Sequence, residues 1–309
     1  LVAGFRRKLF AAVGYVPFAH QAQWQLATEG RLLLPMPAAS LLPLAHADVL
    51  VYDHELLPNE TVRQTLTING FACSVVARAT VPRPGGVAHV AIDMGGYKIG
   101  KSFSTAHWAA GFGIIPRAKV QFVGIEYGTS EHEFNYLLDA LLAAPPRGLG
   151  MKYTKLHNDK RGGRMILVLK ATGAAFEVKS WNQKETLKGD KITAYCFTEA
   201  YQLPGFEVYT TNAQNLRELH GFAQFSTTAD RPWVSVFHKF GHGEDPDWHC
   251  TCGVDGSANP YTFDPRARTR DDPKRGGLMT KERFAISWEG KLGAFIGRVY
   301  DHQQGQRLF

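Results

Sequence analysis

The feature that most constrains this chain is a glycine-rich loop, GGYKIGKS at residues 95–102. In a phosphate-binding loop, glycines let backbone N–H groups approach the phosphate oxygens closely, and the helix that follows points its positive end at the same anion. The spacing alone also occurs by chance, and such a stretch is then an ordinary turn with an exposed lysine. Here the buried-strand pattern VAHVAID (87–93) precedes the loop and a helical pattern (102–110) follows it, up to Gly111. This context favours a phosphate-binding loop.

The rest of the chain alternates between strand and helix patterns. Helical periods occupy 5–30 and 130–144, and strand patterns occupy 48–80, 118–126, 192–200 and 222–227. A hairpin is expected around 171–173, and Ser130 with Glu133 forms a predicted capping box. Together these patterns predict an α/β fold of the P-loop NTPase class, of the additional-strand, catalytic-glutamate (ASCE) type. Its central sheet would be mainly parallel and flanked by helices, with an antiparallel addition and a small lid or linker subdomain.

Composition narrows the class further. The formal net charge is +7, which suits a polyanionic partner without requiring one. No apolar run is long enough to cross a membrane, so no membrane partner is expected. The chain has four cysteines, too few for a disulfide framework at this length, and a reducing intracellular setting is the simpler interpretation.

Hydrolysis by such a fold needs an acid at the end of a neighbouring buried strand. The strand pattern 192–200 ends in Thr198-Glu199-Ala200, and Glu199 is predicted to orient or deprotonate the attacking water. Thr198 stands where an aspartate is usual, and its hydroxyl would hold a metal-bound water more weakly than a carboxylate. An exposed acid at a strand end is the alternative for Glu199.

The order of these motifs resembles the ATPase domain of the large terminase subunit, the motor that packages DNA into tailed-phage and herpesvirus-type capsids. The glycine loop resembles that family's Walker A motif, and the segment 173–205, which contains Thr-Glu-Ala at the end of its strand, resembles its Walker B region. The remaining segments that carry the resemblance are 123–134, 225–233, 255–261 and 284–303. The resemblance spans roughly residues 85–303.

The resemblance implies roles for individual residues. ATP would be bound by Gly95, Gly96, Lys98, Gly100, Lys101, Ser102, Phe103 and Gln21, the last being the family's adenine-contacting glutamine. Catalysis would rest on Glu199, Lys101 and Thr227, with Thr227 chosen from the coupling motif Ser226-Thr227-Thr228 as the sensor of the γ-phosphate. Mg²⁺ would be held by Ser102 and Thr198. Gln21 precedes the loop by an unusually long interval, which a β-rich insertion at about 40–80 would explain.

Two further groups of residues invite functional interpretations. Histidines and cysteines gather in HKFGHGEDPDWHCTC (238–252), but their spacing matches no regular zinc motif, and we favour a surface loop or lid segment over a metal site. Basic residues gather at 152–164 and 266–277, where they could grip DNA phosphates or be solvated loops. Arg161 or Arg164 could instead act in trans on a neighbouring subunit's nucleotide.

The resulting expectation is an ATPase core over residues 1–235 and a lid or linker subdomain over 236–309. As the resemblance implies, it would use ATP and Mg²⁺, act on double-stranded DNA, and work with a portal protein and a small terminase subunit. It would assemble as a pentameric ring in the host cell cytoplasm, without a nuclease domain in this chain. Two alternatives stay open: another nucleic-acid helicase or translocase, and a nucleotide-binding assembly protein with little turnover.

Overall fold

The structure, a computed structural model, describes most of the central part of the chain. The described residues are 2–13, 15, 17–33, 50–56, 62–68, 71–78, 80–159, 164–187, 191–231, 234, 245–256, 259, 281–291, 300–301 and 306–307.

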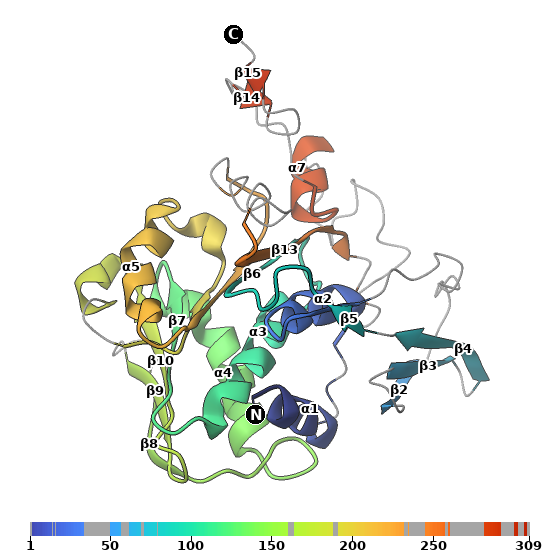
Figure 1. Cartoon of the computed structure of the whole chain (residues 1–309), viewed down its shortest axis with the longest axis horizontal. Helices are drawn as coiled ribbons and strands as arrows, with labels where there is room; N and C mark the ends of the chain where they lie inside the picture. The colour runs from blue at the N-terminus through green and yellow to red at the C-terminus, as the bar shows by residue number, and fades with distance from the viewer. Residues whose placement is uncertain are drawn as a thin grey trace.

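An eight-stranded sheet organises the molecule, in the order β13-β6-β12-β11-β7-β10-β9-β8 (Figure 1). The strands are β13 Trp248–Val254, β6 Val90–Gly95, β12 Phe222–Thr227, β11 Ala194–Phe197, β7 Lys119–Gly124, β10 Ala175–Ser180, β9 Arg164–Leu169 and β8 Tyr153–Asp159. All pairings from β13 to β10 are parallel, whereas β9 and β8 add antiparallel pairings at the far edge. The predicted fold class and the hairpin between β9 and β10 are confirmed.

Helices cover both faces of this sheet, as its buried parallel strands require. Buried hydrophobic side chains on one face of the sheet pack against four helices, α1 (Val2–Ala12), α2 (Ala19–Ala27), α3 (Lys101–Ala110) and α4 (Glu131–Leu142). A second cluster joins the opposite face to α5 (Glu207–Arg217) and to residues of the 3₁₀ turns η5 (Trp181–Leu187) and η6 (Ala200–Gln202). The remaining short elements are η3 Gly111–Ile114, η4 Tyr127–Ser130, α7 Lys281–Ser287, β14 Tyr300–Asp301 and β15 Gln306–Arg307.

The predicted β-rich insertion forms a sheet of its own (Figure 1). Its antiparallel strands are β2 (Leu50–Leu56), β3 (Val62–Ile68) and β4 (Phe71–Arg78). Before and after it, β1 (Arg31–Leu33) pairs antiparallel with β5 (Thr80–Pro82), with Leu33 opposite Thr80. The chain therefore leaves the main body and returns to it at nearly the same place.

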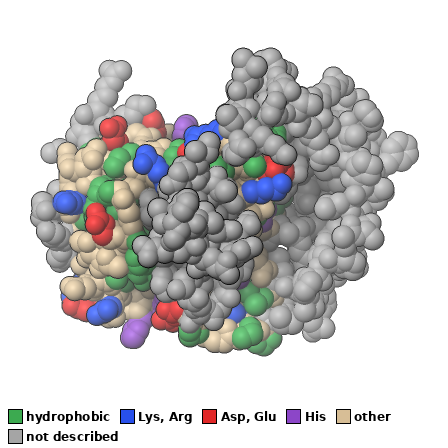
Figure 2. Space-filling model, turned by 90° about the horizontal axis from the view of Figure 1, so that it is seen from above, with side chains coloured by type: hydrophobic (Ala, Val, Ile, Leu, Met, Phe, Trp, Pro, Cys, Tyr) green, Lys and Arg blue, Asp and Glu red, His purple; other side chains and the backbone are tan. Residues whose placement is uncertain are grey.

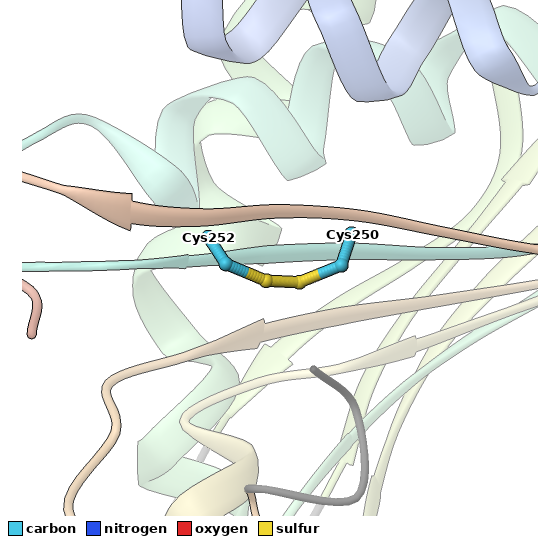
Figure 3. Close-up of a disulfide and its surroundings, with 2 residues drawn as sticks. All are labelled: Cys250 and Cys252. Atoms are coloured by element: carbon cyan, nitrogen blue, oxygen red, sulfur yellow. A yellow bond between two sulfur atoms is a disulfide. The ribbon is translucent and has the colours of Figure 1, made fainter. Parts of the chain in front are cut away.

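The segment from Trp248 to Val254 corrects one expectation. It was predicted to belong to a surface loop or lid, but it is β13, which pairs with β6 at the edge of the main sheet, and Cys250 is buried in the core. Cys250 and Cys252 are joined by a disulfide along this strand (Figure 3), a local link that ties no distant segments together. Cys196 is free and buried. The division near residue 235 stays a prediction, although pairing in the main sheet continues beyond it.

Candidate nucleotide site

The glycine loop connects β6 directly to α3, as the sequence predicted. Gly100 has φ 87°, a left-handed conformation that favours glycine, and a Cβ there would lie 2.7 Å from the Gln21 Nε2 atom. Ser104 N donates to Gly100 O at 3.0 Å, which starts the hydrogen bonds of α3. The N–H groups of the first turn, Lys101 to Phe103, therefore have no acceptor within the helix and suit an anion.

Lys101 lies at the centre of a group of carboxylates. Its ammonium donates to the carbonyl oxygens of Gly95 at 3.1 Å and Gly96 at 2.9 Å. Burial lowers its pKa, while the negative charges of Glu199, Asp93 and Glu133 act to raise it. The lysine is thus held at the loop by groups that phosphate oxygens could replace.

Glu199 follows β11, at the carboxyl edge of the sheet where β6 also ends. It adopts a left-handed backbone (φ 44°), and its Oε2 atom is buried with no hydrogen-bond partner among the described residues. In the sheet, β12 lies between β6 and β11. An acid with a spare oxygen beside the lysine could position a water.

Thr227 is the last residue of β12, the strand that lies between β6 and β11. Its hydroxyl accepts a hydrogen bond from Tyr201 N at 3.0 Å and donates to Thr228 O at 2.9 Å. The hydroxyls of Ser226 and Thr228 are buried and have no partner within the described part of the chain. Thr227 therefore links the end of β12 to the turn that follows Glu199.

Thr198 is buried, and its hydroxyl is already engaged. It lies in a short hydrogen bond with the Ser130 hydroxyl and 3.5 Å from Val123 O. Ser130 was predicted to cap α4 through its side chain, and that prediction is wrong because no side-chain cap bond forms there. The predicted role of Thr198 in holding Mg²⁺ stays a prediction.

Glu133 is a site residue that the sequence analysis assigned only to a helix cap. Burial raises the pKa of Glu133 to about 7, and hydrogen bonding to the Ser102 side chain acts in the opposite direction. Its Oε2 atom is buried without a partner among the described residues. One signal was available in the sequence, because Glu133 lies on the buried face of α4 with Leu137, Ala140 and Leu141.

Asp93 is a second carboxylate that the sequence analysis did not assign. It lies on β6, fully buried, two positions before the loop. Burial raises its pKa to about 7, and the charge of Lys101 acts in the opposite direction. Because the strand around Asp93 is otherwise apolar, the sequence pattern indicated only a buried strand and gave Asp93 no role.

Gln21 reaches the loop across the long interval in sequence. Its Nε2 atom donates to Gly100 O at 3.0 Å and to Ile99 O at 3.3 Å, and its Oε1 atom accepts from Phe18 N at 2.9 Å and Tyr15 Oη at 3.2 Å. The β1–β5 pairing brings α2 and β6 together. The contact with adenine that the resemblance implies stays a prediction.

Aromatic side chains lie next to the loop. The exposed ring of Phe103 contacts Tyr15, His107 and Tyr136 at centroid distances of 5.2, 4.1 and 5.1 Å. Burial lowers the pKa of His107 to about 4, so this side chain is a neutral packing group at physiological pH.

The segment after β13 packs against the other side of the loop. Tyr97 N donates to Ser287 O at 2.6 Å, and Gly96 N donates to Val254 O at 2.8 Å. The Lys98 ammonium lies 5.8 Å from the ring centroid of Trp288. Part of the predicted lid or linker thus contacts the loop directly.

The remaining candidates lie elsewhere or outside the described residues. Arg161, His238, His242 and the basic stretch 266–277 are outside them. Arg164 begins β9, which β12, β11, β7 and β10 separate from β6, so the structure does not bring it to its own loop.

Mg²⁺ fits the residues present at the loop. In proteins this ion is commonly bound through one or two carboxylates together with phosphates of the substrate. The Ser102 hydroxyl and the orphaned buried oxygens of Glu133 and Glu199 supply that chemistry. Over the described ranges, no group of three or more His, Cys, Asp or Glu residues could hold a metal ion.

Among the helices of the described residues, none is long and apolar enough to cross a membrane.

Comparisons with known proteins find a likeness in structure only. No family model matches the sequence, and no curated protein matches it. Among solved structures, the ATPase domain of the Thermus phage P74-26 large terminase aligns at a TM-score of 0.50 with 15% identity, over 66% of this chain and 88% of that one. The large terminase of bacteriophage HK97 aligns at 0.52 with 12% identity, over 66% of this chain and 47% of that one.

The large terminase of a further, thermophilic bacteriophage aligns at a TM-score of 0.51 with 16% identity, over 72% of this chain and 53% of that one. The match thus spans about half the length of the HK97 protein and of this thermophilic phage protein. At these identities the likeness concerns the fold. The chain has the fold of the ATPase domain of phage large terminases, with the P-loop at the place where β6 meets α3.

Proposed function

We propose that this chain is the ATPase domain of a large terminase, a motor that hydrolyses ATP to move double-stranded DNA into a viral procapsid. One observation carries the proposal. A P-loop lysine, the strand-end acid Glu199 and the Thr227 strand end meet at one edge of a sheet ordered β13-β6-β12-β11-β7. The resemblance in motif order supports the same conclusion.

In this proposal ATP binds at residues 95–102 with its phosphates over the first turn of α3. Bound Mg²⁺ neutralises charge on the phosphate oxygens. Lys101 leaves the Gly95 and Gly96 carbonyls for the outer phosphates, and Glu199 orients the attacking water and takes its proton. Thr227 senses loss of the γ-phosphate through its bond to Tyr201 N, which follows Glu199 closely in the chain.

The wider assembly also belongs to the proposal. An arginine of a neighbouring subunit, Arg161 or Arg164, would complete the site in a pentameric ring that works with a portal protein and a small terminase subunit in the host cell cytoplasm. On the face seen in Figure 2, the described basic side chains are interspersed with acidic ones. The basic stretches 152–164 and 266–277, chosen from the sequence, are the candidate DNA contacts.

Steady-state ATP hydrolysis, with and without double-stranded DNA, tests the proposal. Lys101→Ala should abolish turnover, and Glu199→Gln should lower kcat by about 10²–10⁴-fold, the range that a general base contributes. Lys170→Ala and Glu207→Gln are matched controls away from the loop and should retain wild-type rates. Full turnover by Lys101→Ala would show that the site is wrongly assigned. A hydrolysis rate that does not change when DNA is added would argue against the proposed motor function.

One observation favours a second candidate, a nucleotide-binding assembly protein with little turnover. The residue at the usual Walker B aspartate position is Thr198, whose hydroxyl is committed to Ser130. For this candidate, ATP binds tightly but is not hydrolysed under any condition, with DNA present or absent. The same titrations and rate measurements separate the two.

A further inference from the structure

The pair formed by Ser130 and Thr198 raises a question about the metal. The resemblance places the metal-supporting aspartate at position 198, but the threonine hydroxyl there is bonded to Ser130 and lies 3.5 Å from Val123 O. The strand that ordinarily supplies the metal-supporting acid therefore offers a neutral side chain whose oxygen is occupied.

Glu133 supplies a carboxylate at the same place from a different element. It lies in the first turn of α4, a helix that packs against α3, and hydrogen bonding to the side chain of Ser102, the P-loop hydroxyl that holds Mg²⁺ in this motif, acts to lower its pKa. Lys101 and Glu199 are its charged neighbours. Glu133 thus lies among the three groups to which the proposed site assigns the metal, the outer phosphates and the attacking water.

The burial of Glu133 needs a reason beyond helix capping. The residue is 1% exposed, and its Oε2 atom has no partner among the described residues. A buried carboxylate without full hydrogen bonding costs free energy, and a protein retains one where a cation or a ligand completes it. Ser130, the other member of the predicted capping box, bonds to Thr198 and makes no cap bond, so the predicted box does not account for the buried carboxylate.

We propose that Glu133, acting with Ser102, is the carboxylate that holds the nucleotide's Mg²⁺ in place of the aspartate missing from the Walker B strand. This inference rests on the proposed ATP site. It predicts that nucleotide binding is metal-dependent and that the metal-binding carboxylate comes from α4. Thr198 then has no need to bind the ion.

The test measures metal binding without relying on turnover. The purified chain is titrated with Mn²⁺ in the presence of saturating ADP, with free Mn²⁺ followed by electron paramagnetic resonance. Glu133→Gln keeps the size of the side chain and should weaken Mn²⁺ binding by about 10–100-fold, the range seen when groups supporting a metal are removed. ADP affinity without divalent metal should not fall, because the substitution removes a negative charge from beside the phosphates. Glu131→Gln, two positions earlier on the same helix, should leave both constants unchanged.

The outcomes separate this inference from the proposed function. If wild-type protein binds ADP and Mn²⁺ but Glu133→Gln keeps the wild-type Mn²⁺ affinity, Glu133 does not hold the metal. That result overturns this inference and leaves the proposed function standing. If wild-type protein binds neither, the ATP site itself is wrong. A double variant, Glu133→Gln with Thr198→Asp, provides a further check, because restored Mn²⁺ binding shows that the two positions serve one ion. An unchanged thermal melting curve for Glu133→Gln confirms that lost binding is not lost folding.

Discussion

Asp93 offers a sharp test of the electrostatics beneath the P-loop. Burial raises its pKa from 3.8 to about 7, so the folded protein binds a proton there more tightly than the unfolded chain does. Stability from this group is therefore fully present below about pH 4, is lost as the pH rises towards 7, and stays low above that. At 1.36 kcal/mol per pKa unit, the difference corresponds to about 4 kcal/mol, an upper limit.

Asp93→Asn removes the charge and keeps the shape. The free energy of unfolding of the variant minus that of the wild type should be lowest at pH 4 and should rise by a few kcal/mol, up to about 4, by pH 8. Urea unfolding at a series of pH values, followed by tryptophan fluorescence, measures it. The difference reports the titration of Asp93 together with its electrostatic coupling to Lys101.

Asp139→Asn, an exposed substitution on α4, is the control and should change stability by less than about 0.5 kcal/mol at each pH. A difference for Asp93→Asn that stays flat from pH 4 to pH 8 would refute the reasoning. It would mean that Asp93 is ionised throughout and is paired with Lys101 strongly enough to offset its burial.

Two further substitutions test the packing around the loop. A Cβ at Gly96 would collide with the carbonyl oxygen of Trp288, so Gly96→Ala should cost about 1–3 kcal/mol in urea unfolding, whereas Gly205→Ala, with open space around it, should cost less than about 0.5 kcal/mol. Gln25 donates to the Ser104 hydroxyl at 2.9 Å, and Gln25→Ala should lower stability by about 1–3 kcal/mol because that buried hydroxyl loses its partner; an unchanged melting temperature would contradict this.

The P-loop, its strand and its helix could be predicted because their signals are local. The glycine spacing, the apolar run before it and the helical period after it all lie within about one supersecondary unit. The order of the strands in the sheet did not follow from pattern alone. Only a mainly parallel sheet was predicted, and the parallel pairings β13–β6–β12–β11 confirm that part of the prediction.

What the sequence missed depends on contacts between distant segments. Ser130 and Glu133 fit a capping box by every local rule, yet Ser130 bonds to Thr198 without capping the helix, and Glu133 is buried. Trp248–Val254 was not predicted as a strand because its polar and sulfur-containing residues resemble a loop, and only pairing with β6 makes it part of the sheet. In both cases tertiary packing overrides a local preference.

The pairing of β1 with β5 has a consequence for how this protein can vary. Since Leu33 lies opposite Thr80, the two strand ends are already spaced for a tight reverse turn. The stretch between Leu33 and Thr80 can therefore be exchanged. A two-residue Asn-Gly link, or an unrelated small domain with adjacent ends, could replace it without moving Gln21 away from the loop. The chain can thus gain or lose a module at this point while the residues of the proposed nucleotide site keep their places.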